Sequence, residues 1–498
     1  MAVFDEQHPM NTLTRRGFLR QINCAAVGSG ALLNTLINLR MANSLAAQGA
    51  SGHKALVALF LNGGVDSFNV LVPYDTTRYN TYSVSRGAAG TEGGLALSRS
   101  SLRVMTETLP TYGLHPSCAR LHEMATGTGT YGFSGKRRVA FLANVGTLVQ
   151  PTTKAQFLAW ENGSNLTHPV PRSLFSHVDQ VEQWQTAVPQ GLAQLRGWLG
   201  RAADVLNPVH NQSQVSMGIS LNGNNVLQVG NQTEPFAITP AGSLAFTGDA
   251  GGSAVNPLQL KNSALRSTLD QHYANLLTES FSRITRNSDD AQVYFQGQFE
   301  SSGAALPSNV NSLFSASNPL AQTLRTVARA IKVGPQMGLN RQTFFVNYGG
   351  WDHHGELLDT QAGMLTTLDQ ALGSFQQALE LLGLANNVVT FTVSDFGRTL
   401  RSNGRGSDHA WGGNPIVMGG PVDGGKLFGT YPNLALNSAD DVGRGGRFLP
   451  STSADLYFAE LLRWFGVPNN QLTYALPNLA NFFNPSSASA PLGFIKPA

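Results

Sequence analysis

The sequence predicts an α/β fold with a mostly parallel central sheet covered by helices on both faces. Short apolar runs of strand length recur along the chain, and amphipathic helical patterns lie between several of them. Continuous apolar runs are typical of strands buried on both faces, as in a parallel sheet. Strands that alternate with helices are typical of α/β domains.

Five runs have the length and composition of buried strands. Each is rich in Val, Phe, Ile and Leu and is flanked by Gly, Asn or charged residues. They are Ala55–Leu61, Arg138–Ala143, Thr343–Tyr348, Asn387–Val393 and Pro415–Met418. Because these runs are continuously apolar, we expect layers of helix on both sides of the sheet.

Three segments have apolar residues at helical spacing. Asn318–Val333 begins with an Asn cap and a proline in the first turn. Gly363–Leu384 is a long amphipathic segment directly before an expected strand, and Thr452–Phe465 ends at Gly466. We expect all three to be helices that cover the sheet.

The segment from about 208 to 317 differs from the rest, because it is rich in Gly, Asn, Gln and Ser. We interpret it as an insertion that packs against the main sheet. Within it we expect strands around a turn at Ser216–Gln228 and mostly helix at Leu258–Thr285. Residues 485–498 are rich in Pro, Ser and Ala and predict a loosely packed, flexible tail. Residues 48–484 are expected to form a single domain.

Residues 1–47 have the pattern of a twin-arginine export signal. Adjacent arginines in Thr14–Leu19 precede a modestly apolar stretch at Ile22–Ile37, and small residues at Ser44–Ala47 suit a cleavage site. The apolar stretch is too short and too polar for a stable membrane anchor. We therefore expect the twin-arginine translocase to export the folded chain to the periplasm or out of the cell.

Composition narrows the function classes. The chain is 42% hydrophobic and only 13% charged, with 53 glycines, as expected of a folded, loop-rich protein. Beyond residue 47 it carries 29 basic and 28 acidic residues, so no nucleic-acid partner is expected. Cys24 lies in the signal, which leaves Cys118 alone and excludes an internal disulfide in the exported chain.

Two expected strands run into a pair of glycines and then an acidic residue. The first continues into Asn62–Asn69, which contains Asp66, and the second into Gly349–His354. Paired glycines allow a tight turn or a close approach of the backbone to a ligand. Asp66 is either a metal ligand or a helix cap. Asp352 beside His353 and His354 has the ligand chemistry of zinc or another transition metal, although a surface turn can carry the same residues.

A third polar cluster follows the expected strand at Asn387–Val393. It contains Asp395 and Arg398, and Asp408-His409 lies in the Gly-rich loop beyond. Arg398 either binds an anion such as phosphate or sulfate or pairs with one of the acids. Ligands bind at the carboxyl ends of strands in open parallel sheets, so we expect one site there. Its candidate residues are Asp66, Asp352, His353, His354, Asp395, Asp408 and His409. Such a set favours one or two divalent metal ions, zinc or calcium.

These motifs resemble a secreted bacterial family catalogued as domain of unknown function 1501. The resemblance rests on the twin-arginine start and on the segments Leu-Asn-Gly-Gly-Val-Asp-Ser-Phe-Asn, Gly-Gly-Trp-Asp-His-His, Ser-Asp-Phe-Gly-Arg-Thr and Asp-His-Ala-Trp-Gly-Gly. It spans nearly the whole chain. That family is similar in fold to the alkaline phosphatase and sulfatase superfamily. The resemblance therefore implies an alkaline-phosphatase-like sheet whose strand ends carry an early Asp, a Ser, Thr or Cys nucleophile, and later Asp and His ligands.

The resemblance also implies roles for residues that match the superfamily pattern. Asp66 matches the early Asp, and Asp352 with His354 or His353 matches one metal site. Asp395 matches the Asp of the other site, and His409 the late His. This chain has Asp395-Phe396 where the superfamily usually has Asp-His, so the second site lacks a ligand.

The nucleophile stays open. Thr147 follows the strand that ends near Asn144, and Ser176-His177 resembles a Ser-His pair common in the family. Ser67 lies beside the first Asp and is too early in the chain.

The motifs favour a metal-dependent hydrolase of small anionic phosphate or sulfate esters. Its catalytic candidates are Thr147, Ser176, His177 and Arg398. The alternative is a non-catalytic cell-envelope protein that keeps the fold to bind a protein partner, and the uncertain nucleophile favours it. An oxidoreductase with an organic cofactor is disfavoured, because no Gly-x-Gly-x-x-Gly follows an expected strand with a ribose-binding acid downstream.

Overall fold

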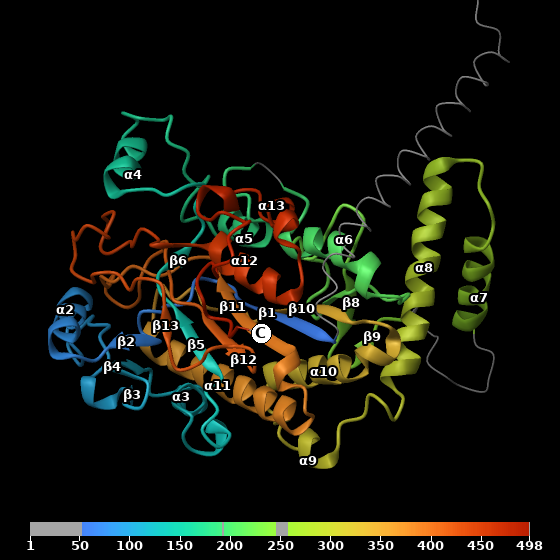
Figure 1. Ribbon diagram of the computed structural model, residues 1–498, viewed down its shortest axis with the longest axis horizontal. Helices are drawn as coiled ribbons and strands as arrows, with labels where there is room; N and C mark the ends of the chain where they lie inside the picture. Colours follow the sequence, from blue (N-terminus) through green and yellow to red (C-terminus); the bar gives the residue numbers. More distant parts are fainter. Residues whose placement is uncertain (1–51, 192–193, 246–256, 498) are drawn as a thin grey trace, which may run out of the picture. The chain divides into compact units, whose positions relative to one another are not determined.

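The computed structural model describes residues 52–191, 194–245 and 257–497 (Figure 1). The expected export signal at residues 1–47 lies outside these ranges. Within them, no helix has both the length and the apolar character that crossing a membrane requires.

In the described part of the chain, nine strands form the main sheet, in the order β13-β5-β12-β11-β1-β10-β7-β8-β9. They are β1 Lys54–Leu61, β5 Val139–Leu142, β7 Gly218–Ser220, β8 Phe236–Thr239, β9 Gly242–Ser243, β10 Arg341–Asn347, β11 Val388–Ser394, β12 Ile416–Gly419 and β13 Leu427–Phe428. The neighbours β11, β1, β10, β7 and β8 all run parallel, whereas β12 and β9 run antiparallel to theirs. The mostly parallel sheet predicted from the sequence is therefore confirmed.

Helices cover both faces of this sheet, as predicted (Figure 1). One layer consists of α3 Ala119–Thr126, α10 Pro319–Val333 and α11 Leu357–Leu381, and the other of α5 His177–Thr186, α6 Trp198–His210 and α12 Ala454–Phe465. The central strand β1 lies between the two layers. Its residues Ala55–Leu61 are at most 3% exposed, because no side of this strand faces solvent.

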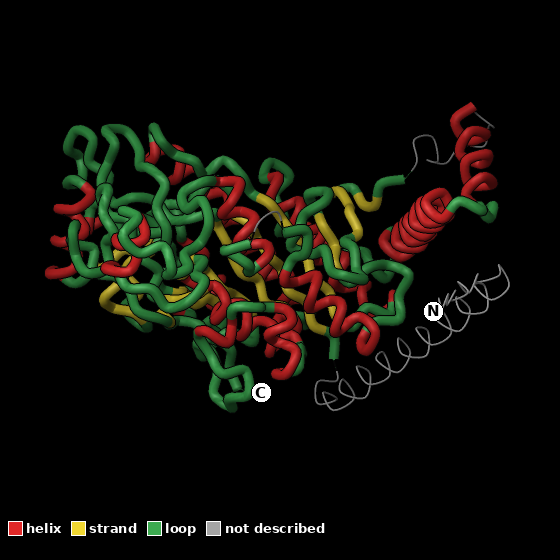
Figure 2. Tube along the Cα trace, turned by 90° about the horizontal axis from the view of Figure 1, so that it is seen from above, coloured by secondary structure: helices red, strands yellow, loops and turns green. Residues whose placement is uncertain are grey.

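Smaller elements complete the described chain. A three-stranded antiparallel sheet has β4 Leu109–Leu114 between β2 Leu71–Pro73 and β3 Arg103–Met105, and β6 Val145–Gly146 pairs with β14 Thr452–Ser453. The remaining α-helices are α2 Thr76–Arg86, α4 Lys154–Glu161, α7 Pro257–Leu269, α8 Leu276–Phe299, α9 Ser308–Asn311 and α13 Leu472–Ala475. Figure 2 shows the sheet from above, with loops covering much of the side opposite α7 and α8.

The predicted helices form, although α11 differs from its prediction at both ends and Thr452–Ser453 belong to β14 rather than to α12. The Asn318 side chain caps α10 by accepting the N–H of Ala321 at 3.0 Å, and α12 ends at Gly466, which has φ 110°. Helix α11, however, begins at Leu357 rather than Gly363. Its first turns hold polar residues that obscure the apolar period, although Gln361 is buried and hydrogen-bonds to the backbone of Asp66.

The insertion differs from the prediction in two places. Of the strands expected at Ser216–Gln228, only β7 forms. The Gln228 side chain donates to the carbonyls of Thr343 (3.0 Å) and Ile219 (3.3 Å), so side-chain bonds take the place of a second strand. The helix expected at Leu258–Thr285 is divided into α7 and α8. Asn275 separates them, because its side chain accepts the N–H groups of Leu277 and Thr278 and caps α8.

The C-terminal segment is packed against α12. Buried Glu460 accepts the N–H groups of Leu492, Gly493 and Ile495 at 2.6, 2.6 and 2.7 Å. The Phe494 side chain is fully buried in the main core. The expectation of a loosely packed tail therefore does not hold for residues 492–495, where one carboxylate and one aromatic ring anchor the chain.

Candidate metal centre

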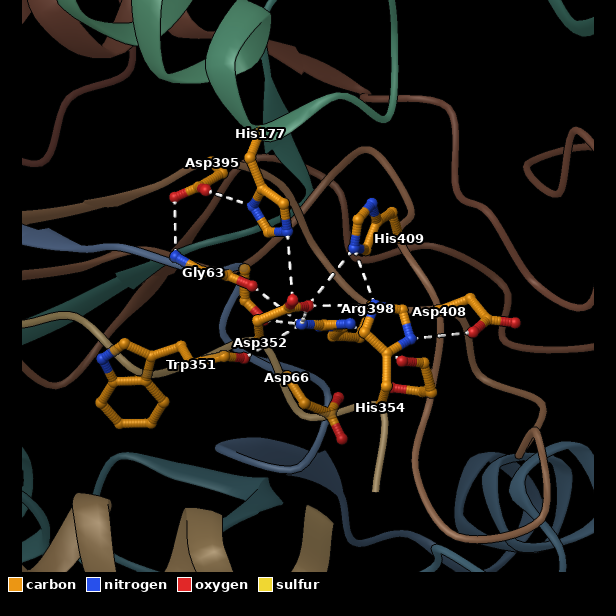
Figure 3. Close-up of polar contacts among 12 residues, drawn as sticks. Gly63, Asp66, His177, Trp351, Asp352, His354, Asp395, Arg398, Asp408 and His409 are labelled. Atoms are coloured by element: carbon orange, nitrogen blue, oxygen red, sulfur yellow. Dashed lines mark hydrogen bonds and ion pairs between the residues drawn. The ribbon is translucent and has the colours of Figure 1, made fainter. Parts of the chain in front are cut away.

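Three central strands deliver the candidate residues to one edge of the sheet. In the parallel register Phe60 lies beside Asn347 and Leu61 beside Ser394, so β1, β10 and β11 end at the same level. The loops that follow carry Gly63, Asp352 and Asp395 (Figure 3). A parallel sheet thus brings Gly63 into contact with Asp395, 332 residues further along the chain.

Two glycines allow these loops to approach each other. Gly63 has φ 121°, and a Cβ there would lie 2.6 Å from the backbone nitrogen of Asp352. Gly64 has φ 85°, and a Cβ there would lie 2.5 Å from the Phe396 ring. Both positions combine a left-handed backbone with no room for a side chain, and only glycine tolerates that combination. Here the glycine pair serves close packing of loop against loop.

Arg398 ties the same loops together from inside the protein. Its side chain is fully buried, and its three guanidinium nitrogens donate to the backbone carbonyls of Gly63, Gly64, Trp351 and Ser407 at 2.8–3.2 Å. It also forms an ion pair with Asp352. Of the two roles considered for Arg398, binding an anion or pairing with an acid, the structure shows the second. The guanidinium is occupied, and it fixes the position of the Asp352 carboxylate.

Three imidazoles near Asp352 each have Nδ1 bonded to an acceptor. His177 Nδ1 lies 2.7 Å from Asp395 Oδ2, and His354 Nδ1 lies 3.1 Å from Asp408 Oδ1 (Figure 3). His409 Nδ1 lies 2.8 Å from the Phe175 carbonyl. Carboxylate and carbonyl oxygens only accept, so Nδ1 carries the proton in each neutral ring. Each Nε2 is therefore left with a lone pair.

These Nε2 atoms gather around the Asp352 carboxylate. The distances to its oxygens are 3.4 Å from His177, 3.1 Å from His354 and 3.3 Å from His409, and the Nε2 atoms of His354 and His409 are 2.9 Å apart. The ligand atoms of His177, Asp352 and His409 all lie within 4.8 Å of one another. We call these three residues with His354 the His-Asp cluster. Lone pairs and a carboxylate facing one another at such distances repel unless a proton or a metal ion lies between them.

The donor set fits a divalent transition metal. Imidazole nitrogens and a carboxylate are the ligands that zinc accepts at about 2.0–2.2 Å, so neighbouring ligand atoms are separated by roughly 3.3 Å. His177 Nε2 is buried and has no hydrogen-bond partner among the described residues. A buried nitrogen without a partner costs free energy unless something binds it. The cluster has the composition and spacing that a resident ion requires, and calcium, which prefers oxygen ligands, fits it less well.

Burial and charge set the ionisation of the cluster. Burial opposes ionisation of Asp352, but the hydrogen bond and charge of Arg398 outweigh it, so the pKa of Asp352 lies below its usual value. Burial lowers the pKa of His409, which favours the neutral ring. Burial raises the pKa of Asp395, although the N–H of Gly63 and the His177 ring oppose that shift. An ionised Asp352 beside a neutral imidazole is the state that binds a cation.

Phe396 forms an apolar wall behind the imidazoles. It is 2% exposed, and its ring centroid lies 4.8 Å from that of His177 and 4.4 Å from that of His409. Phe396 therefore packs against two imidazoles and supplies no ligand atom to the cluster.

Three residues predicted as metal ligands have other environments. Asp66 is fully buried in an ion pair with Arg86, away from the cluster (Figure 3). His353 is 5% exposed, and burial lowers its pKa to about 4; the structure gives its ring nitrogens no partner among the described residues. Asp395 binds the N–H of Gly63 at 3.0 Å and His177 Nδ1, so it orients a ligand.

The two candidate nucleophiles lie outside the His-Asp cluster. Thr147 is buried, and its hydroxyl donates to Gln183 at 2.9 Å. Ser176 precedes α5, and its hydroxyl donates to Asp179 at 2.7 Å. Among the described residues, no Ser, Thr or Cys side chain is hydrogen-bonded to a side chain of the cluster. Thr147 was chosen because it follows a strand end, and Ser176 because it forms a Ser-His pair. In the structure neither hydroxyl is hydrogen-bonded to a side chain of the cluster.

Sequence reasoning missed one group of this centre, the Phe175 carbonyl, and gave His177 another role. His177 was singled out as half of a Ser-His pair rather than as a metal ligand. The Phe175 carbonyl, which orients His409, is a backbone group at a residue with φ 73°. No side-chain pattern signals such a carbonyl. His177, by contrast, could have been grouped with the cluster if every His in the chain had been treated as a potential ligand.

The family model for a protein of unknown function (DUF1501) matches residues 53–478. The chain belongs to the DUF1501 family. The match spans every strand of the main sheet and every residue of the His-Asp cluster. No curated protein matches the chain at a significant level.

Solved structures with similarity to this DUF1501 chain are distant. The chain is similar to Ps i-CgsB, with 12% identity, a TM-score of 0.30, and coverage of 87% of this chain and 78% of that one. It is also similar to the lipoteichoic acid synthase LtaP from Listeria monocytogenes, with 10% identity, a TM-score of 0.28, and coverage of 82% and 80%. A substituted alkaline phosphatase PafA has 12% identity, a TM-score of 0.26, and coverage of 71% and 64%. Scores this low assign neither chemistry nor residue roles to the DUF1501 chain.

Proposed function

We propose that this DUF1501 chain is a hydrolase of phosphate or sulfate esters that depends on one divalent metal ion. The observation that carries the proposal is the convergence of three imidazole Nε2 atoms on the Asp352 carboxylate, each ring having its Nδ1 bonded to an acceptor. His177, Asp352 and His409 would hold the ion, with His354 beside them. Three protein ligands leave a coordination position open, as in catalytic zinc sites.

The protein groups around the cluster have separable roles in this proposal. A bound divalent ion supplies polarisation of the ester and neutralisation of charge that develops in the transition state. Asp395 keeps the proton on His177 Nδ1, and Arg398 holds Asp352 in place. His354 has a 45% exposed side chain and hydrogen-bonds to Asp408, so its Nε2 can exchange a proton with a substrate at the solvent side.

The placement of the hydroxyl groups favours direct attack by water. Thr147 and Ser176 bond to other side chains, and neither contacts the His-Asp cluster. We therefore propose hydrolysis without a covalent Ser, Thr or Cys intermediate. A burst of product at mixing, equal in amount to the enzyme, would contradict this part of the proposal.

Metal analysis of natively exported protein tests the proposal. We expect about one divalent ion per chain, and turnover of aryl phosphates or aryl sulfates. His177→Gln should lose both, because it removes one ligand atom. His272→Gln is the matched control, since its ring is 90% exposed and lies outside the cluster. Metal-free wild-type protein, or equal turnover in both variants, would contradict a metal hydrolase. Recovery of one stoichiometric partner by metal-free protein would favour an envelope-binding protein.

We also propose twin-arginine export, which the pattern at Thr14–Leu19 supports. Replacement of both Arg15 and Arg16 by Lys should leave the protein in the cytoplasm, as measured by cell fractionation. Equal export of the doubly substituted chain would show that another signal directs it.

A further inference from the structure

The helices α7 and α8 form a hairpin that extends beyond the edge of the main sheet (Figures 1 and 2). Residues 270–275 join them, and polar groups hold them together. Arg266 pairs with Asp289 at 2.6 Å, Ser282 donates to the Leu269 carbonyl at 2.9 Å, and Arg286 lies 3.6 Å from Asp270. On α8 these partners are Ser282, Arg286 and Asp289, spaced i, i+4, i+7. They define the face of α8 that packs on α7.

A second face of α8 is apolar and open to solvent. Leu277, Phe281 and Ile284 also follow i, i+4, i+7 spacing, and they are 80%, 70% and 61% exposed. The same stripe continues into Ala291 and Phe295, which are buried where the C-terminal half of α8 packs on α10 and β9. One stripe, interrupted by Ser288, is thus buried over its inner half and, among the described residues, exposed over its outer half.

The exposed area is large enough to form part of a stable interface. Leu276, which is 81% exposed, lies beside the stripe at the start of α8, so the outer end of this helix presents four large apolar side chains. Together these expose on the order of 600 Å², at the upper end of the largest patch on a typical monomer. A standard interface buries about 800 Å² per partner, so this stripe with its polar rim matches that size.

The charges of the hairpin favour a second copy of the chain as the occupant. Residues 257–299 hold four basic and four acidic side chains, so the hairpin is neutral. A membrane surface would be favoured by excess Lys and Arg. Ser280 and Thr285 flank the stripe, Ser288 lies within it, and none of the three is charged. A partner helix from another protein is usually selected by charged residues beside the apolar stripe. Two identical stripes, in contrast, can meet here without repulsion between like charges.

We propose that two copies of the chain dimerise through the outer stripes of α8. The two helices pair antiparallel, so that Phe281 of one copy packs against Ile284 of the other, and the α7 helices lie outside the pair. Such an interface is self-complementary, as a twofold dimer requires. It lies on the insertion, away from the His-Asp cluster, and does not depend on the proposed activity.

Sedimentation velocity of the full exported chain between 1 and 100 µM tests the dimer. Wild-type protein should be dimeric at the upper end of this range. Leu277→Asp combined with Ile284→Asp should sediment as a monomer, because each dimer would bury four unpaired carboxylates. Leu260→Asp is the matched control. This residue is 61% exposed on α7, outside the stripe, and its substitution should leave the dimer intact. All variants should keep the thermal midpoint of monomer unfolding, since the residues replaced are exposed.

Three outcomes would overturn the proposal. The first is wild-type protein that stays monomeric at 100 µM. The second is a dimer that persists in the doubly substituted chain, which would place the interface elsewhere. The third is a monomer that floats with vesicles of phosphatidylethanolamine and phosphatidylglycerol at 3:1, which would identify the stripe as a membrane contact.

Discussion

Three histidines owe their orientation to three different acceptors, one of them a backbone carbonyl. Asp395, Asp408 and the Phe175 carbonyl each receive an Nδ1–H, and together they aim three Nε2 atoms at Asp352. Partners of this kind fix both the ring orientation and the tautomer of a ligand, and their loss typically weakens metal binding 10–100-fold. At the scale of residues, the cluster therefore depends on groups that would touch no metal.

Asp395→Asn tests this dependence with almost no change of shape. The N–H of Gly63 holds one side-chain oxygen, so the amide would present its NH₂ group to His177 Nδ1. The His177 ring would then carry its proton on Nε2. A protonated Nε2 has no lone pair with which to bind a cation. We expect metal affinity to fall about 10–100-fold, as measured by competition with a chromogenic chelator. Asp369→Asn is the control, because the Asp369 carboxylate is buried, accepts two backbone N–H groups and lies remote from the cluster. This substitution should leave the metal affinity unchanged.

The buried carboxyl group of Asp455 predicts how the free energy of unfolding depends on pH. Asp455 is 2% exposed, its Oδ1 has no partner among the described residues, and burial raises its pKa to about 7. Between the unfolded pKa of 3.8 and about 7, only the folded state keeps the proton. Wild-type stability therefore falls as pH rises through that window, by up to about 4 kcal/mol. Asp455→Asn lacks this loss, so its stability relative to wild type should increase from pH 4.5 to pH 7.5 in urea titrations. A constant difference across that range would contradict the assignment.

The loops after β1, β10 and β11 determine the site at the scale of elements. Gly63 lets the first loop lie against the second, and Arg398 joins both to the loop at Ser407. In Gly63→Ala, the alanine would have to adopt a left-handed backbone conformation. Its Cβ would also lie too close to the backbone nitrogen of Asp352. We expect a loss of about 2–4 kcal/mol in unfolding free energy, with reduced metal content. Gly355→Ala controls for the substitution, because a Cβ there meets no atom within 4 Å.

The sequence predicted elements better than contacts, and particular residues show why. Strand β1 and helix α10 were found because their apolar period and the Asn318 cap are local signals. The proximity of Asp352, His354 and His409 could be predicted because parallel strands end at one edge. The ion pair of Asp66 could not, because its partner Arg86 lies on α2 and only the folded chain brings the two together. The Phe175 carbonyl, as a backbone group, had no sequence signal.

At the scale of the whole molecule, the described part of the chain has no disulfide to stabilise it. Cys118 is a free, buried thiol, so a reducing agent should not change the thermal midpoint. A chelator should lower the thermal midpoint, because an ion that binds only the folded state raises the free energy of unfolding by about 2.7 kcal/mol when present at 100 times its Kd. Differential scanning calorimetry of wild type and His177→Gln, each with and without chelator, measures this shift. We expect the chelator to shift the wild type alone, and an equal shift in both proteins would contradict a structural contribution from the cluster.

The order of the strands also has a consequence for synthesis. Strand β1 lies at the centre of the sheet, yet its neighbours β10 and β11 begin at residues 341 and 388. About 280 residues separate the end of β1 from the start of β10, so at 5–20 residues per second a ribosome takes roughly 15–55 s to supply the first partner. During that interval a strand whose residues Ala55–Leu61 are all apolar stays unpaired, and such segments aggregate readily. We therefore expect the nascent chain to be prone to aggregation until the second half of the protein has emerged.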